Sequence, residues 1–405
     1  MWLAESLATL KSKLGTIDQV IFEDKGHLDH PEDLVFLQDV DGANRALVSM
    51  QKTIKRPKTV TIKWDGYPAL IFGRNQHGKF SIMDKHMFNK KDGSGRQIFS
   101  PKQFQQYDQA RGVDRSDLHR LVSEIWSGLE KASRGTKGYY WGDLLFNKPL
   151  MNMDGVYNFK ANPNGITYSV KAKSSVGRLL TDKTAGIAVH QQLSPDAPTT
   201  DYAQTLNGSI GQLKNNSDVA IVPSAMPIVP DLTPHGNLEK NAQQTIAQYG
   251  DEVKKMMNSA PMARNSFSQL FTTYINKRIV SGNLKDLYKG FLEYVNNRSM
   301  SDTMKKKLLG YTVGAPAGNI AEAQVQKVPG YLDQNKDGLI GAFKIWIALY
   351  NLKMHIVSQL NDAAKDSPVQ GALDDGTKTH EGFVSNGLKF VDRMGFSRQN
   401  LAGRA

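Results

Sequence analysis

Residues 59–72 of this 405-residue chain read Thr-Val-Thr-Ile-Lys-Trp-Asp-Gly-Tyr-Pro-Ala-Leu-Ile-Phe. β-Branched and apolar residues alternate over 59–63, which predicts a strand with Ile62 facing a core. Asp65-Gly66 is a strong turn signal, and residues 69–72 form a second apolar run. The stretch therefore predicts a strand, a tight turn and a returning strand, with Lys63 at the end of the first strand.

The tetrapeptide Lys63-Trp64-Asp65-Gly66 resembles motif I of the covalent nucleotidyltransferases, the superfamily of ATP-dependent DNA ligases, RNA ligases and mRNA-capping guanylyltransferases. In that family a nucleotide becomes covalently attached to the motif lysine. The alternative is an exposed hairpin with Lys63 as a solvated surface charge, because four residues alone match many unrelated proteins. Further residues are needed to separate the two interpretations.

The composition favours an anionic partner and removes several kinds of site. The 51 Lys and Arg against 39 Asp and Glu give a formal net charge of +12, which is typical of proteins that bind nucleic acid or nucleotides. The chain has no cysteine. Disulfide frameworks, thiolate zinc sites and cysteine nucleophiles are therefore excluded.

The sequence predicts neither export nor membrane insertion. Residues 2–14 predict a short amphipathic helix without the basic start and long apolar run of a secretion signal. No stretch reaches the roughly eighteen apolar residues that a membrane span needs. We expect a soluble cytoplasmic protein, in the cytoplasm of the host cell if a bacteriophage encodes it, as the compact, cysteine-free sequence suggests.

An acidic segment precedes the first long helix. His30-Pro31-Glu32-Asp33 offers several metal ligands, but a proline and acids are also typical of the first turn of a helix. We therefore predict a helix start here and assign no metal. The helix itself is predicted over residues 42–54 from its apolar spacing.

Three later segments add candidates for the same site. Residues 78–83 predict a strand that ends just before Lys85, and residues 139–146 predict a buried strand interrupted by Asp143. Such an acid must be hydrogen-bonded, paired or bound to a metal, and pairing with an arginine is the structural alternative. The segment resembles family motif III with aspartate in place of glutamate, and Lys85 lies where the family has a basic nucleotide contact. The predicted strand at 186–191 lies at the position of motif IIIa but lacks its base-stacking aromatic residue.

The composition also divides the chain into segments. Residues 1–195 and 367–405 have strand and turn character, whereas 196–235 are rich in Pro, Ser, Asn and Thr and predict a linker or an extended surface segment. Amphipathic and buried helical patterns dominate residues 236–366. We therefore predict an α+β protein in which a helical domain is inserted into a domain of antiparallel sheets.

Asn386-Gly387 between two apolar runs is the strongest short hairpin signal in the chain. A two-residue loop would pair Val384 with Lys389 and place Glu381 and Lys389 on opposite faces. A three-residue loop would pair Phe383 with Lys389 and place Glu381 and Lys389 on one face. We predict the three-residue loop, because only that register presents an acid and a base to one ligand.

The hairpin extends the resemblance. Glu381-Gly382-Phe383-Val384 is similar to motif IV and Leu388-Lys389-Phe390-Val391 to motif V, which usually has a second lysine where Val391 stands. Pro68 likewise replaces an arginine or asparagine often found after motif I. The lysine, the two acids and the second lysine occur in the family's order, although 381 − 63 = 318 residues exceed the usual interval. An inserted helical domain accounts for that length.

The resemblance implies a ligase-like nucleotidyltransferase domain over 1–195 and 367–405, a helical insert at 236–366 and no C-terminal OB domain, since 405 − 391 = 14 residues follow Val391. It implies Lys63 as the catalytic nucleophile toward ATP, with GTP as the alternative. Mg²⁺ would be held by Asp143 and Glu381. The implied nucleotide-binding residues are Ile62, Asp65, Gly66, Lys85, Asp143, Glu381 and Lys389.

The implied activity is that of an RNA-ligase-like enzyme, in which adenylate on Lys63 passes to an end of RNA or of nicked or broken DNA. The helical insert would bind this substrate or a protein partner. The alternative is a ligase-like scaffold with a degraded site that acts as a nucleic-acid-binding or assembly protein. Val391 and Pro68 favour this alternative, whereas the presence of Lys63, Gly66 and Glu381 opposes it.

Overall fold

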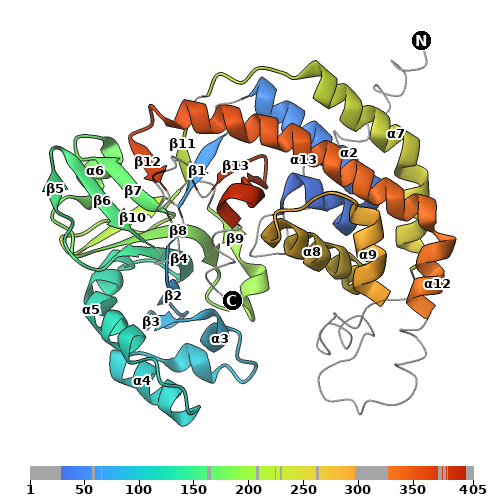
Figure 1. Cartoon of the computed structure of the whole chain (residues 1–405). Coiled ribbons are helices and arrows are strands. Elements are labelled where there is room, and N and C mark those ends of the chain that lie inside the picture. The colour runs from blue at the N-terminus through green and yellow to red at the C-terminus, as the bar shows by residue number, and fades with distance from the viewer. Residues whose placement is uncertain are drawn as a thin grey trace. The chain divides into compact units, whose positions relative to one another are not determined.

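The computed structural model describes residues 29–56, 60–64, 66–161, 166–206, 209–223, 225–228, 230–260, 264–296, 327–372, 376, 380 and 382–397. They form two units (Figure 1). Unit 1 contains the described residues of Lys63–Met226 and Pro368–Lys378, and unit 2 those of Asp29–Ile62, Pro227–Ser367 and Thr379–Ala405. Helices and strands occur in both units, and the sheets are antiparallel or mixed, which confirms the α+β class.

A six-stranded sheet forms the centre of unit 1. Its order is β10-β8-β4-β2-β3, with β9 paired to β8. Neighbours are antiparallel except β10, which runs parallel to β8. The strands are β2 (Ala69–Arg74), β3 (Phe80–Met83), β4 (Gly138–Phe146), β8 (Ala185–Leu193), β9 (Gln204–Thr205) and β10 (Val219–Pro223).

Helix α5 (Ser116–Ala132) covers one face of this sheet. It contacts β2, β3 and β10 and buries an apolar stripe that includes Val122, Ile125 and Leu129. The other helical segments of unit 1 are α3 (Lys85–Phe88), η3 (Ser94–Gln97), α4 (Pro101–Ala110), α6 (Ser175–Leu180) and η4 (Thr200–Tyr202). Ser100 caps α4 by accepting a hydrogen bond from the Gln103 amide.

A second, antiparallel sheet of unit 1 has the order β12-β7-β6-β5. Its strands are β5 (Asn152–Met153), β6 (Val156–Lys160), β7 (Thr167–Lys171) and β12 (Val369–Ala372). β12 follows the long helix of unit 2 in sequence and pairs with β7, so the chain returns to unit 1 for this one strand.

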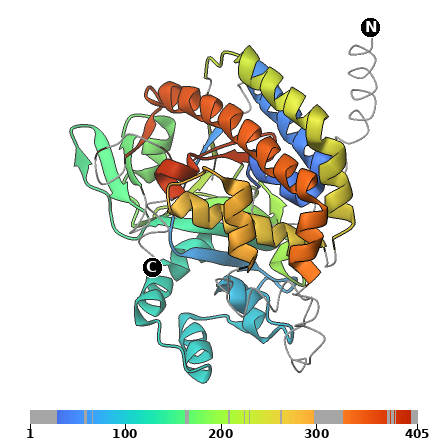
Figure 2. The same ribbon diagram turned by 45° about the vertical axis from the view of Figure 1, so that its right-hand side comes forward.

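Unit 2 is mainly helical. Helices α2, α7 and α13 contact one another and run side by side (Figure 2). The rings of Phe36, Phe271, Phe291 and Phe343 bring α2, α8, α9 and α13 into one aromatic core. The helical elements are η1 (Pro31–Asp33), α2 (Leu34–Lys55), α7 (Gly236–Asn258), α8 (Arg264–Val280), α9 (Leu287–Asn296), α12 (Lys327–Gln334), α13 (Lys336–Ala364) and the π-helical turn η5 (Arg393–Ser397).

The predicted helix start at Pro31 is confirmed, and its acids enter a buried charge network. Lys353 Nζ of α13 donates to Glu32 Oε1 at 2.6 Å. The Arg393 guanidinium donates to Asp33 Oδ1 at 2.8 Å and to Glu32 Oε1 at 3.3 Å. The Trp346 indole also donates to Asp33. Since buried charges are costly unless paired, these contacts tie η1, α13 and η5 together.

A small sheet has the order β11-β1-β13-β14. In unit 2, β1 pairs with β13, with Thr61 opposite Val384 and Ile62 opposite Phe383. This pairing connects two segments that are far apart in the sequence. Ile62 is fully buried, as predicted. The strands are β1 (Thr61–Lys63), β11 (Ala225–Pro227), β13 (Phe383–Ser385) and β14 (Leu388–Phe390).

The predicted three-residue loop between β13 and β14 is wrong. Ser385 pairs with Leu388 and Val384 with Lys389, so the loop contains two residues. Asn386 and Gly387 both have positive φ, 49° and 71°, which is the turn that matches the twist of paired strands. The shared face expected for Glu381 and Lys389 depended on the longer loop and loses its basis.

The units divide the chain differently from the predicted domains. Residues 29–62 and 379–397 belong to the helical unit 2, whereas 196–226 belong to unit 1. The segment predicted as a linker contains β10, whose apolar run Val219–Val222 is buried beside β8. A short apolar run among polar residues forms a strand only where a neighbouring strand can pair with it. The local sequence does not show whether such a neighbour is present.

Three predictions lie outside the described residues: the helix at 2–14, Asp65 and Glu381. Of the helices that the structure describes, none combines the length and the apolar character of a membrane-spanning helix.

Candidate functional site

The turn after Lys63 is fixed on strand β4. The Tyr67 amide donates to the Leu144 carbonyl at 3.0 Å and to the Ala161 carbonyl at 3.2 Å, and the Leu144 amide donates to the Pro68 carbonyl at 3.0 Å. These bonds extend the pairing of β2 with β4 into the turn. The lysine turn therefore lies beside the segment of Asp143.

Gly66 makes the closest approach. A Cβ atom at this position would lie 2.4 Å from the Leu144 carbonyl oxygen and 3.0 Å from the Asp143 Cβ. No side chain is accommodated there without moving the backbone of β4. The glycine is thus needed for the packing of the turn against Asp143.

Asp143 lies on an accessible part of β4. Its partners on the neighbouring strands are Ala69 and Ala188, and residues directly opposite in antiparallel pairs share a face. Ala69 is exposed and Ala188 is buried, and the Asp143 side chain keeps 16% of its surface exposed. The basic side chain that lies beside its carboxylate is that of His190, rather than the arginine considered from the sequence.

His190 owes its position to an irregularity in β8. Trp141 pairs with Gln191 and the next residue, Gly142, pairs with Val189, so His190 is the extra residue of a bulge. Its Nε2 lies 3.5 Å from Asp143 Oδ1. Its ring centroid lies 5.6 Å from that of Trp141. The bulge thereby adds an imidazole to the surroundings of the acid.

Lys85 completes what we call the Asp143 cluster: Lys85, Trp141, Asp143 and His190. The Lys85 ammonium lies 5.3 Å from the centroid of the Trp141 ring, in cation–π geometry. Lys85 is exposed and is the first residue of α3. Three residues predicted from the sequence, Gly66, Lys85 and Asp143, are therefore brought together in unit 1, with Trp141 and His190 added by the structure.

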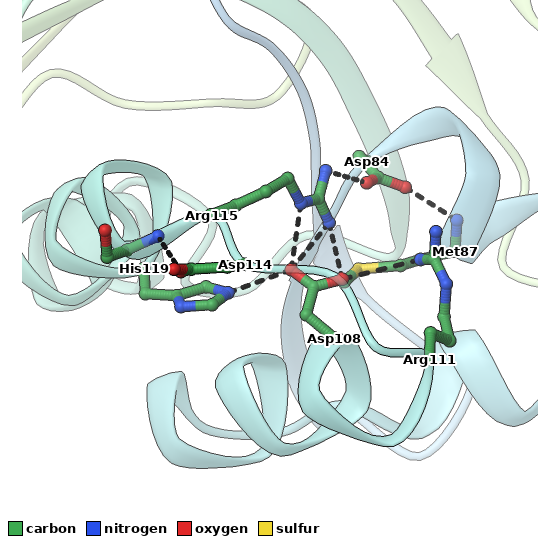
Figure 3. A network of polar contacts seen from close by, with 8 residues as sticks. Asp84, Met87, Asp108, Arg111, Asp114, Arg115 and His119 are labelled. Carbon is green, nitrogen blue, oxygen red and sulfur yellow. Dashed lines mark hydrogen bonds and ion pairs between the residues drawn. The ribbon is translucent and has the colours of Figure 1, made fainter.

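A network of ion pairs holds α3 in place (Figure 3). Asp84 caps α3 by accepting from the Met87 amide at 2.7 Å, and its other oxygen accepts from Arg115 at 2.6 Å. Arg115 also donates hydrogen bonds of 2.7 and 2.9 Å to the carboxylate of the fully buried Asp108. His119 Nε2 lies 2.9 Å from the same carboxylate.

Burial alone would raise the pKa of Asp108. Hydrogen bonds from Arg115 and His119 outweigh burial and hold the pKa of this carboxyl below its usual value. Asp108 is thus an anion inside the unit, and its partners are fixed by it. The start of α3, and with it Lys85, rests on this buried charge.

Lys63, the predicted nucleophile, belongs to unit 1, whereas Ile62 and Lys389 belong to unit 2. The Lys389 amide donates to the Asp29 carbonyl at 3.0 Å. The Lys389 charge also contributes, with burial and with Arg393 and Lys353, to a pKa of His30 well below its usual value. Glu381, the second predicted metal ligand, lies outside the described residues.

The residues that the structure describes can be compared with the ligands that a divalent cation needs. Within the described ranges, no group of three or more His, Cys, Asp or Glu side chains is arranged to hold a metal. Mg²⁺, however, is usually bound by one or two carboxylates together with substrate phosphates and water. Asp143, flanked by alanines, suits that mode of binding.

Comparison with known proteins places the chain in a family. A family model described as a family of unknown function, DUF6267, matches residues 25–404. The chain belongs to DUF6267. No curated protein and no solved structure matches the chain.

Proposed function

We propose that the chain is a covalent nucleotidyltransferase that attaches a nucleotide to Lys63 and passes it to an end of a nucleic acid strand. The observation that carries the proposal is the packing of the lysine turn on the strand of Asp143. Gly66 lies against Asp143 and Leu144, so two segments with the pattern of one site are neighbours in unit 1.

The first step would be attack by the Lys63 amine on the α-phosphorus of ATP, or of GTP. The bond from nitrogen to phosphorus forms, the bond to the bridging oxygen breaks, and pyrophosphate leaves with the electron pair. The amine must be neutral to attack, and it loses a proton as the phosphoramidate forms. Cations held close to the amine would favour its neutral form.

The Asp143 cluster supplies groups suited to nucleotide phosphates. Lys85 offers a compact cation for phosphate oxygens, and Asp143 would hold Mg²⁺, which offsets phosphate charge when bound. His190, whose Nε2 lies 3.5 Å from Asp143 Oδ1, would orient this carboxylate. Residues 63–226 contain 21 Lys and Arg and 14 Asp and Glu, so 21 − 14 gives a net charge of +7. This excess favours an anionic acceptor such as RNA or DNA.

The test is incubation of the protein with α-phosphate-labelled ATP or GTP and Mg²⁺, followed by a denaturing gel. We expect label that survives denaturation, is released by acid as a phosphoramidate is, and vanishes in Lys63→Ala. Asp143→Asn should lower labelling about 10- to 100-fold. Lys55→Ala removes an exposed lysine at the end of α2 and should label like the wild type.

A second candidate is a ligase-like scaffold that binds nucleic acid without the covalent step. The two-residue loop of the β13–β14 hairpin favours it, because Lys389 pairs with Val384 and not with Phe383. Absence of label with either nucleotide, from folded protein that still binds nucleic acid, would support this candidate and overturn the first.

A further inference from the structure

A groove in unit 1 lies between α4 and α5, away from the residues of the Asp143 cluster. It has a volume of about 990 Å³. Both helices and the loop between them contribute to its walls, among them Lys102 and Gln109 of α4 and His119, Arg120 and Ser123 of α5. The groove is a feature of helices α4 and α5 that no predicted site residue uses.

The walls are polar and carry a small excess of positive charge. Lys102 and Arg120 are exposed cations, and Asp114 is the one acid among the lining residues. The Asp114 carboxylate already accepts from the Ser116 amide at 3.1 Å. Arg120 shares an exposed ion pair with Asp117 at 2.9 Å, a type of pair that is weak and easily exchanged for another anion. The groove therefore favours an anionic ligand.

The lining also indicates which part of an anion is bound. Pockets for small organic ligands are mostly apolar and aromatic, whereas Phe, Tyr and Trp are absent from the lining of this groove. Without such rings there is no platform on which nucleobases could stack. Hydroxyls, amides and cations are the groups that contact phosphate and sugar.

His119 connects this groove to the Asp143 cluster. It lines the groove and is fixed by Asp108. Arg115 joins Asp108 to Asp84, the cap of α3, as Figure 3 shows. α3 begins with Lys85, which lies over Trp141. One continuous set of contacts thus runs from the wall of the groove to the cluster.

From these observations we infer that the α4–α5 groove binds the phosphodiester backbone of a nucleic acid strand, without reading its bases. Binding of this kind stands on the groove alone and does not require the covalent step. That the bound strand is the acceptor for the nucleotide on Lys63 rests on the proposed function.

The test compares two isosteric variants on one helix. Gln109→Glu adds a negative charge to the groove, and Gln106→Glu adds the same charge to an exposed position of α4 outside the lining. Binding of a fluorescent 20-nucleotide single-stranded RNA is followed by anisotropy in the whole protein, without ATP. We expect Gln109→Glu to weaken binding about tenfold and Gln106→Glu less than about twofold.

A second pair of variants tests the cations. Lys102→Ala with Arg120→Ala should weaken binding and reduce the slope of log affinity against log salt by about 1.4, as the loss of two phosphate contacts to a single strand requires. Arg134→Ala with Lys137→Ala removes two exposed cations just beyond the C-terminal end of α5 and should leave both nearly unchanged. Equal effects of the lining and control variants on RNA affinity would overturn the proposal that the groove is the binding site. They would indicate diffuse attraction of RNA by the net charge of the protein.

The two proposals fail separately. Absence of label in the wild-type protein with intact RNA binding would overturn the covalent step and leave the groove in place. RNA of random and of uniform sequence should bind equally, and a strong preference for one sequence would contradict backbone recognition. Competition by inorganic phosphate at concentrations equal to those of RNA phosphate would show a small-anion site instead.

Discussion

Gly66 is the residue at which the lysine turn approaches β4 most closely. Its added Cβ would meet the Leu144 carbonyl at 2.4 Å. We predict that Gly66→Ala destabilises unit 1 by about 2 kcal/mol, since backbone must move to relieve the overlap. Hydrogen exchange of peptides from β4 measures this directly. Gly236→Ala, where an added Cβ meets nothing within 4 Å, is the control, and equal exchange in both variants would refute the argument.

His380 makes the stability of unit 2 depend on pH. Burial lowers the pKa of His380 to about 4 in the folded chain. The unfolded chain binds this proton near pH 6.5, so stability is full above that pH and is lost as the pH falls toward 4. The loss approaches about 3 kcal/mol, at about 1.4 kcal/mol for each pKa unit.

Urea unfolding at pH 7.5 and pH 5, followed by tryptophan fluorescence, tests this prediction. His380→Gln should be less sensitive to acid than the wild type, although His30, whose pKa is also lowered, retains part of the effect. His77→Gln replaces an exposed histidine and should behave as the wild type. An unchanged acid sensitivity in His380→Gln would show that burial of this ring is not its cause.

At this scale the sequence predicts local structure better than it predicts neighbours. The turn at Gly66, the strand that ends before Lys85 and the apolar strand that contains Asp143 are all present in the folded chain. The contribution of His190 is not predicted, because it depends on a bulge at Trp141 and Gly142. A bulge inserts one residue into the alternation, and nothing in the local sequence marks where it falls.

Among the elements, the β13–β14 hairpin shows what limits prediction. The signal Asn386-Gly387 correctly marks the turn, but it is compatible with two loops that differ by one residue. The observed loop has both residues at positive φ, and its tip is held by the Asn386 amide, which donates to Thr53 Oγ1 of α2 at 3.0 Å. That tertiary contact is absent from the local pattern. The expectation that Glu381 and Lys389 share a face therefore predicted the wrong loop length.

The buried network of η1, α13 and η5 makes a second prediction at this scale. Lys353→Met removes a cation that is fully buried and leaves Glu32 with Arg393 at 3.3 Å. We expect a loss of about 3 kcal/mol in the free energy of unfolding, because the buried Glu32 loses its shorter ion pair and a poorly compensated buried charge is costly. Adding Glu32→Gln should restore part of that loss. Urea unfolding measures both, with Lys336→Met, an exposed change on the same helix, as the control.

A double variant no more stable than Lys353→Met would contradict pairing as the role of these charges. The helix start was predictable from Pro31 and its acids. The burial of those acids was not, because Lys353 and Arg393 approach from segments more than 300 residues away.

For the whole molecule, the α+β class and the helical character of residues 236–366 follow from apolar periodicity. The assignment of segments to units does not. Residues 34–55 have a clear apolar face, but the sequence gives no means of choosing between a sheet and the helices α7 and α13 as its partner. Contacts with those two helices place α2 in unit 2. β12 lies in unit 1, whereas β13 and β14 lie in unit 2. The sequence does not predict this difference either, because it does not show which strand each of them will pair with.

The central claim is that Lys63 carries a nucleotide, and one measurement tests it most directly. The wild-type protein is incubated with ATP and Mg²⁺ without an acceptor, digested, and its peptides are analysed by mass spectrometry. We predict one adenylate, on Lys63, strongly reduced in Asp143→Asn and unchanged in Lys55→Ala. An adenylate on another residue, or none with either ATP or GTP in folded protein, would contradict the account.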